Sequence, residues 1–364
     1  NVLRREWEQT AAATPGQTAE GVGQATQRFI AMTGDIKTAR ANQRVFATAA
    51  SASGADVESV AATSASIADK FKITNQADMK EVLSSLIYQG KEGAFEMSDA
   101  AQYFQEMASA GASFGMQKGV GSVKTLGGLA QLARAETSSG AEASTAVQRM
   151  FTQLKLKAGD LSGGKYGEKV DIYDAQGNTR GIAELLPQII ASVGGNDAAM
   201  KQTGLQKIFD TEGFKAVSPL TRAYNEAFQG TKGTDEERRA AGMKAVSEAL
   251  DKATNAAGDW SDVVIDAAKA QENSSAKFTA AWERFVAVVG EEVLPALTPL
   301  IGELTNFKGE ISSVIEGFGL FLRGLREVLE FLNIVKPKSP SERLAENQQK
   351  LKELDAAAEG VTTV

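Results

Sequence analysis

The chain contains no cysteine and no histidine among its 364 residues. Without cysteine it forms no disulfide and offers no thiolate nucleophile or thiolate metal ligand. Without histidine it lacks the commonest general base, the imidazole metal ligand and the histidine-activated serine or cysteine nucleophile. These absences exclude most enzyme classes. They leave carboxylate chemistry, in which two acids face each other across a cleft about 5 to 10 Å wide.

The acidic residues are arranged as sequence neighbours, not as widely spaced pairs. Asp56 lies next but one to Glu58, a run of three acids begins at Asp235, and Glu291 precedes Glu292. Acidic runs of this kind are typically solvated helix faces or helix ends. We therefore predict no catalytic residue, no cofactor and no metal site in this chain.

Long runs of one charge and long apolar runs are also absent. The longest basic runs are the pairs Arg4-Arg5 and Arg238-Arg239, and the net charge is -7. A nucleic-acid-binding protein presents a basic patch instead, so no specific nucleic-acid partner is predicted. In the apolar stretch Ile311–Val335 the longest uncharged run is Gly317–Leu322. A membrane-spanning helix needs about 20 apolar residues, so this stretch does not cross a bilayer unaided.

A partial phosphate-binding motif occurs at Gly159–Lys165. The segment satisfies the G-x-x-x-x-G-K pattern, but Tyr166 stands where a serine or threonine must hold the magnesium ion. The preceding FTQLKLKA has a helical pattern, whereas a phosphate loop follows a buried strand. The segment is therefore interpreted as a surface loop.

A second partial motif, Asp171, Asp174 and Asn178, has some of the oxygen ligands of a calcium loop. Its spacing departs from the D-x-D-x-D-G template and it lacks the bidentate glutamate. The four residues Asp174–Gly177 instead predict a tight turn, in a short two-stranded hairpin near Val170–Arg180.

What the chain does have is apolar side chains at helical spacing. A helix is predicted to begin at the N-cap Ser98 and to end at Gly111, with Phe104 and Met107 on its buried stripe. Gly90 and Gly93 are predicted to end the helix before it. More generally, we interpret as helix ends the glycines at positions 54, 90, 111, 140, 194 and 213.

The predicted fold is all-α, a multi-helical bundle with one short β-hairpin, followed by long amphipathic helices. No fixed period of the solenoid type is present in the sequence. Four regions are predicted: an N-terminal helical connector (1–20), a core helical domain (21–229), a region of long amphipathic helices (230–335), and a polar linker with a short helix (336–364).

The C-terminal amphipathic helices carry more apolar surface than a single helix can bury, and exposed stripes of this kind mark interfaces. We therefore predict that this region binds a partner, either sister copies or another protein, with surface attachment to a membrane as the alternative. The residues predicted to form the interface are Trp282, Phe285, Val289, Phe318, Leu322, Leu325 and Leu329.

The order of several segments resembles one protein family. In chain order, the segments are FIAMTGDIKTARANQRVFATAASASGADVESVA, YQGKEGAFEMSDAAQYFQEMASAGASFGM, LGGLAQLAR, SSGAEASTAVQRMFTQL, VDIYDAQGNTRGIAELLPQI and GLQKIFDTEGFKAVSPL. This order, over about Gly21 to Leu220, resembles the core domain of phage tail tape measure proteins. Each segment alone is an ordinary alanine-rich helix. The chain is short for such a protein, and we expect it to be a fragment or a processed product.

The resemblance implies a structural role: setting the length of the tail tube during assembly and assisting genome delivery through the host envelope. It implies as partners sister copies, with a trimer favoured, together with the tail tube protein, tail tip or baseplate hub proteins, tail assembly chaperones and the host membrane during ejection. It places the chain in the lumen of the virion tail or tail tip, and in the host cytoplasm during assembly. The alternative hypotheses are a membrane-perforating or a cell-wall-degrading ejection protein.

Overall fold

The structure, a computed structural model, describes residues 2–14, 16–193, 198–255 and 258–270. This part is all-helical, as predicted, and its helices belong to one compact unit, Asn1–Ser274. Residues 260–270 are also helical. The named helices are α1 (Val2–Ala12), α2 (Ala19–Thr33), α3 (Ile36–Ser53), α4 (Val57–Phe71), α5 (Gln76–Glu92), α6 (Met97–Phe114), α7 (Val120–Arg134), α8 (Gly140–Ser162), α9 (Ile182–Ser192), α10 (Ala198–Gly230) and α11 (Asp235–Thr254).

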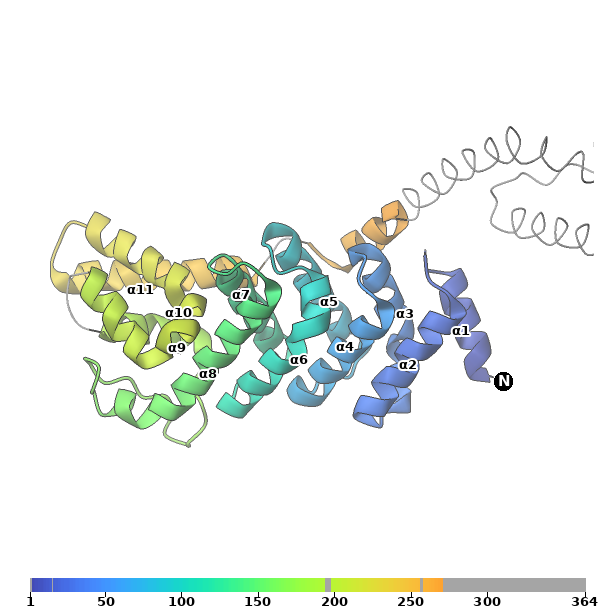
Figure 1. The fold of residues 1–364 in the computed structure, drawn as a ribbon, viewed down its shortest axis with the longest axis horizontal. Helices are drawn as coiled ribbons and strands as arrows, with labels where there is room; N and C mark the ends of the chain where they lie inside the picture. Colours follow the sequence, from blue (N-terminus) through green and yellow to red (C-terminus); the bar gives the residue numbers. More distant parts are fainter. Residues whose placement is uncertain (1, 15, 194–197, 256–257, 271–364) are drawn as a thin grey trace, which may run out of the picture. The chain divides into compact units, whose positions relative to one another are not determined.

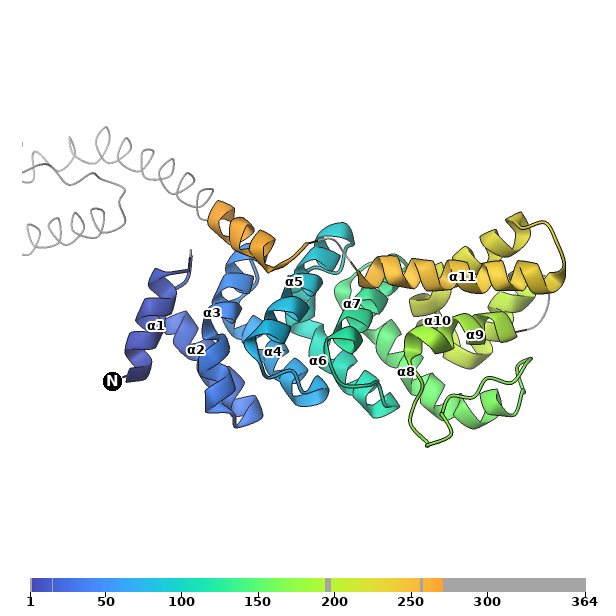
Figure 2. The same cartoon turned by 180° about the vertical axis from the view of Figure 1, so that it is seen from behind.

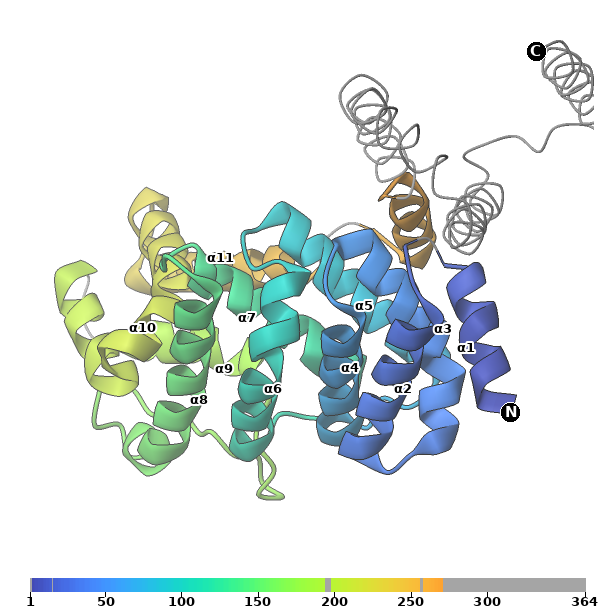
Figure 3. The same ribbon diagram turned by 45° about the vertical axis from the view of Figure 1, so that its right-hand side comes forward.

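The helices are stacked side by side in two layers (Figures 1 and 2). In one layer α2 packs on α4, α4 on α6, α6 on α8, and α8 on α10. Figure 3 shows the helices α2, α4, α6 and α8 in a row. In the other layer α3 packs on α5, α5 on α7, and α7 on α11, which also covers α9. The bundle is thus a stack of helices in the manner of helical-repeat proteins, although the sequence has no repeat period.

The core between the layers is built from alanine, aliphatic and aromatic side chains. Alanine faces allow close approach, and ring pairs fill the remaining space: the Phe29 and Phe46 rings stack with centroids 5.3 Å apart, and Phe114 lies 5.5 Å from Phe151. The predicted core residue Phe104 is fully buried.

Local polar contacts set the helix ends. The N-cap side chains of Thr18, Asp35, Asp56, Asn75 and Ser139 each accept a hydrogen bond from a backbone amide in the first turn of their helix. Asp56 and Glu58 are exposed at the start of α4, as predicted for solvated helix ends.

Two predicted boundaries of α6 are wrong. The helix begins at Met97 and not after Ser98, because Glu96 and Asp99 form a capping box there. It continues through Gly111 to Phe114 and ends at Gly115, which adopts φ 104°. Gly111 stays helical because its backbone is needed for packing: an added Cβ would lie 2.7 Å from the Met116 sulfur.

The interpretation of the glycines as helix ends is confirmed at Gly54 and Gly140 but wrong at three sites. Gly90, Gly111 and Gly213 lie inside helices. At Gly90 an added Cβ would lie 2.9 Å from the Phe95 carbonyl oxygen and the Glu96 Cα atom. Gly90 and Gly213 permit close approach of another backbone segment, whereas side chains approach Gly111. Gly194 lies outside the described residues.

The segment predicted as a β-hairpin is a turn with a single antiparallel bridge between Tyr173 and Thr179. Its turn lies where predicted, with the Gly177 amide donating to the Asp174 carbonyl oxygen at 3.0 Å. The described residues contain no named strand, because the chain leaves this turn directly into α9.

The third region contains one helix that the sequence predicted well, α11. It packs on α7, α9 and α10, so the core continues across the short loop at residues 231–234. The domain boundaries themselves stay predictions.

Candidate functional site

The residues predicted to form the partner interface lie outside the part of the chain that the structure describes, which ends at residue 270. Their prediction is therefore not tested by the structure. The described residues show three other groupings of polar side chains, and each joins segments far apart in the sequence.

The first grouping holds residues 258–270, here called the strap, on α5. Asp266 accepts a hydrogen bond from the Tyr88 hydroxyl at 2.8 Å and forms an ion pair with Lys91. The hydrogen bond from Lys91 is the largest influence on Asp266 and lowers its pKa. Burial, and next the neighbouring Asp266 carboxylate, raise the pKa of Tyr88. Val263 and Ala267 are the strap's buried apolar side chains.

Two hollows lie beside Trp260 of the strap. One, of about 510 Å³, separates the strap from α3 and α5 and includes Arg44 and Lys80 in its wall. The other, of about 470 Å³, is walled by Lys80, Lys124 and Ser85. The Ser85 hydroxyl is buried and has no hydrogen-bond partner among the residues that the structure describes.

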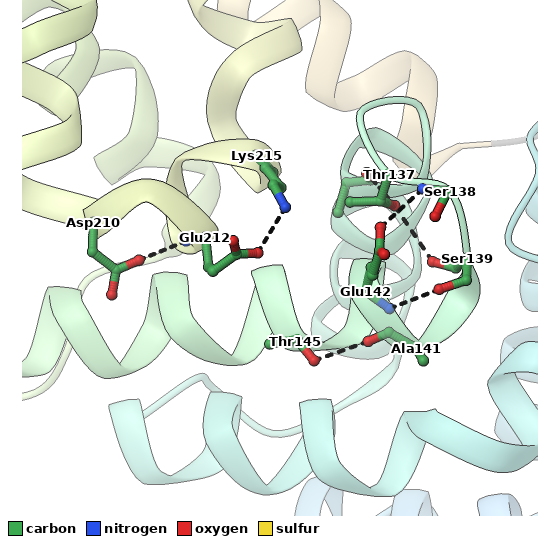
Figure 4. Close-up of polar contacts among 11 residues, drawn as sticks. Thr137, Ser138, Ser139, Ala141, Glu142, Thr145, Asp210, Glu212 and Lys215 are labelled. Carbon is green, nitrogen blue, oxygen red and sulfur yellow. Dashed lines mark hydrogen bonds and ion pairs between the residues drawn. The ribbon is translucent and has the colours of Figure 1, made fainter.

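The second grouping is a polar ridge between the α7–α8 loop and α10 (Figure 4). Ser139 caps α8 by accepting from the Glu142 amide at 3.2 Å, and Glu142 accepts in return from the Ser138 amide at 3.0 Å. That backbone hydrogen bond is the main reason that the pKa of Glu142 is lowered. Across the ridge Glu212 pairs with Lys215 at 2.8 Å. The ridge satisfies helix ends and shows no unpaired reactive group among these residues.

At the end of the ridge Asp210 interrupts α10. Its backbone has φ 56° and ψ -178°, so α10 is a pair of helices joined at a kink. Its carboxylate accepts from the Gly213 amide at 2.9 Å and so caps the second helix of the pair. The same carboxylate accepts from Arg149 at 2.6 Å and Gln153 at 3.0 Å, both on α8.

The third grouping surrounds a buried lysine. Lys201 is 4% exposed and donates to the carbonyl oxygens of Ile190 and Val193 at 2.9 and 2.8 Å. Its ammonium also lies 4.4 Å from the centre of the Tyr224 ring. Burial lowers the pKa of Lys201 to about 8, and the charge of Arg239 adds to the shift. The lysine thus satisfies the carbonyl groups at the end of α9.

The partial motifs do not form ligand sites in the structure. The interpretation of Gly159–Lys165 as a loop is wrong for residues 159–162, which are the last residues of α8. Lys165 pairs with Asp160 at 3.0 Å. Asp174 accepts from the amides of Gln176 and Asn178, so its oxygens serve the turn. Within the described ranges, no group of three or more potential ligands converges to hold a metal ion.

The clear pKa shifts among the carboxyl groups of the described residues all have the same direction. A general acid has a raised pKa, whereas every clear shift of an Asp or Glu here is downwards, as for Glu6, Glu168 and Asp266. In the same part of the chain, no helix combines the length and the apolarity that crossing a membrane requires.

Sequence reasoning missed the residues of these groupings. A signal existed for the strap, because Asp259, Asp262 and Asp266 recur at steps of three and four and mark one acidic helix face. No local signal existed for Lys201, whose carbonyl partners lie at the end of α9. Asp210 had a local partner in the Gly213 amide, but its other partners, Arg149 and Gln153, lie on α8.

The described part of the chain defines an all-helical protein whose polar contacts join helix to helix. Comparison with known families identifies its class: a sequence model of the phage-related minor tail proteins matches residues 5–210, more than half of the chain. The chain therefore belongs to this family and is a component of a phage tail, as the resemblance predicted. The match runs from α1 to the kink at Asp210.

A curated relative is described as "Probable tape measure protein" of Burkholderia phage BcepMu (isolate -/United States/Summer/2002). It is 26% identical over 303 residues, which are 79% of this chain and 34% of the relative. The chain thus spans about a third of the length of this relative. No solved structure matches the chain.

Proposed function

We propose that the chain is a segment of a tape measure protein, which sets the length of the tail tube during assembly and assists genome delivery through the host envelope. The observation that carries the proposal is the likeness to a probable tape measure protein over 79% of the chain, beside the chain's own match to the minor tail protein family.

The fold favours a division of labour within that protein. A ruler made of one continuous helix rises about 1.5 Å per residue, so the 269 residues from 2 to 270 would extend about 400 Å. Here the chain instead folds back repeatedly into two layers of shorter helices. We infer that this stack is a folded domain that does not itself measure length, and that extended parts of the complete protein measure the tube.

The partners follow from this role. Sister copies, in a trimer, would surround a common axis, and the tail tube protein would polymerise around them. Tail tip or baseplate hub proteins would hold one end, and tail assembly chaperones would keep the protein ready in the host cytoplasm. The protein would then lie in the tail lumen and meet the host membrane during ejection.

The test uses the complete gene in its phage. A stop codon early in the gene should abolish tails of normal length. An in-frame helical insertion in an extended part of the protein should lengthen tails by about 1.5 Å per added residue. Deletion of residues 2–270 should reduce the number of tails without shortening them in proportion. Electron microscopy of tail length and number gives the result, and tails of normal length and number from the stop-codon phage would refute the proposal.

A second test addresses the predicted interface. Replacing Leu325 and Leu329 together by aspartate would place two charges in a predicted apolar seam, where unpaired charges are costly. We expect self-association and tail yield to fall while the melting temperature of the helical stack stays unchanged. Replacing Glu327 and Glu330 by glutamine, in the same stretch of the chain, is the control. Normal self-association and normal tails from the double aspartate variant would reject these two residues as an interface.

A further inference from the structure

We propose that the α3–α5 surface beneath the strap is a docking site for acidic amphipathic helices, and that the strap is its releasable resident occupant. This inference concerns residues 2–270 alone and does not depend on the tape measure role. It rests on three observations: the charges of the two surfaces, the small apolar contact between them, and the hollows left around the strap.

The two surfaces are complementary in charge. The surface beneath the strap presents Arg44, Lys80, Lys91 and Lys124. The strap's Asp266 pairs with Lys91. Asp259 and Asp262 add negative charge in the strap's first turn, where their carboxylates accept from backbone amides of the strap itself. On the surface itself, Glu81 of α5 is paired with Lys124 at 3.3 Å, and on the strap Lys269 lies 4.0 Å from Asp266. The surface therefore selects an acidic helix.

The apolar contact is small for a packed helix. Of the strap's large apolar side chains only Val263 is fully buried, while Val264 and Ile265 are 48% and 50% exposed. In α6, by contrast, Phe104 and Met107 are both buried completely. Exposed ion pairs contribute little to stability, so the strap is held by fewer and weaker contacts than the helices of the stack.

The fit is also incomplete. The hollows on either side of Trp260 leave space beneath the strap, and the buried Ser85 hydroxyl faces one of them without a partner. Gly258, at φ 139°, begins the strap with its backbone against the Tyr88 ring. A helix with bulkier apolar residues and the same acidic face would fill this surface better than the strap does.

The absence of cysteine makes release measurable, because a single introduced thiol is the only one in the chain. Ala267→Cys places a thiol under the strap, and Ala146→Cys places one in the core of α8, where the native alanine is equally hidden. We expect the thiol at 267 to react with a thiol reagent several-fold faster than the thiol at 146. Raising salt from about 0.1 M to about 1 M shortens the Debye length from about 10 Å to about 3 Å, and should accelerate only the thiol at 267.

A charge swap separates charge from packing. Adding Asp266→Lys should speed labelling at 267, and adding Lys91→Glu to that variant should slow it again. For docking in trans, a fluorescent peptide of residues 258–270 should bind the full chain carrying Asp266→Lys more tightly than the wild-type chain. Equal labelling at 267 and 146 without a salt effect, no rescue by the swap, or no peptide binding to the opened chain would each overturn the proposal.

Discussion

The part of the stack from α2 to α8 and the part from α9 to α11 bury different kinds of side chain. In the first part the buried polar residues are neutral, such as Asn42, Ser64 and Gln89. In the second part Lys201 is buried, and of the buried side chains in the described ranges it alone is charged. Both parts bury many apolar side chains, and the second part differs in also burying a charge that needs polar partners.

The family match extends across this difference, because residues 5–210 also include α9 and Lys201. The match to the minor tail proteins covers the first part fully and ends at Asp210, where α10 kinks. A core held by small and aromatic side chains tolerates sequence change as long as its volume is kept. A region held by a buried ammonium and a strained carboxylate tolerates less change at those positions. The predictions that follow test this contrast.

The largest effect is expected at a buried site that makes only apolar packing contacts. Phe104→Ala should lower the free energy of unfolding by about 3 to 5 kcal/mol, because it leaves a cavity in a fully buried site of α6. Urea unfolding followed by circular dichroism measures the change. Leu156→Ala on α8, where leucine is 70% exposed, is the control and should change stability little. An unchanged midpoint for Phe104→Ala would show that the first part is not held by packing.

In the second part, the buried Lys201 should make the free energy of unfolding depend on pH. The folded-state pKa of Lys201 is lowered to about 8, while an unfolded lysine titrates near about 10.4. Between these pH values the unfolded chain binds more protons than the folded chain, so this residue makes stability rise with pH. Lys201→Met removes this pH dependence. The free energy of unfolding of the wild type minus that of the variant should therefore increase by about 1 to 3 kcal/mol between pH 8 and pH 10.

The control for this prediction is Lys207→Met, at an exposed position of the same helix. The difference between this variant and the wild type should not change over the same pH range. A constant difference for Lys201→Met as well would show that the lysine is not buried in its charged form. Lys201→Met also leaves the Ile190 and Val193 carbonyl groups without a donor, which lowers stability at every pH.

The sequence alone predicted what depends on local pattern. The all-helical class, α11 and the turn at residues 174–177 were confirmed, because helical periodicity, capping and turn residues act over a few positions. The stacked arrangement was not predicted. Its repeat lies in the geometry of the helices, and the alanine-rich sequence leaves no repeating signature of it.

The glycines show why the rest could not be predicted. Gly54 ends a helix in the left-handed conformation at φ 70°, whereas Gly90 lies in a helix and admits the backbone of residues 95 and 96. The two roles use the same residue type, and only the neighbouring chain distinguishes them. The same limit applies to the strap and to Lys201, whose partners are set by tertiary packing.

A substitution at Gly90 tests this distinction. Gly90→Ala should lower the free energy of unfolding by about 1 to 3 kcal/mol, because the added methyl meets backbone atoms that cannot move aside. Gly159→Ala is the matched control, since this helical glycine has no atom within 4 Å of an added Cβ. It should raise stability by about 0.5 to 1 kcal/mol through helix propensity. Thermal unfolding of both variants measures the two changes. Equal melting temperatures for the two variants would contradict the close approach at Gly90.

The smallest effect is expected at Asp210, where two opposing contributions meet. Its φ of 56° with ψ near 180° is a region that essentially only glycine occupies, at a cost of about 1 to 3 kcal/mol for other residues. Its carboxylate offsets part of this cost by capping Gly213 and by binding Arg149 and Gln153. Asp210→Ala keeps the strain and loses the cap, so it should lower the free energy of unfolding by about 1 kcal/mol.

Asp210→Gly loses the same carboxylate but relieves the strain, and a glycine N-cap costs only a few tenths of a kcal/mol relative to aspartate. The glycine variant should therefore be more stable than the alanine variant, and close to the wild type, in urea unfolding. Because both variants lack the ion pair with Arg149, their difference isolates the backbone. If alanine and glycine were equally tolerated, the kink would carry no strain, and the second part of the stack would be held by packing in the same way as the first.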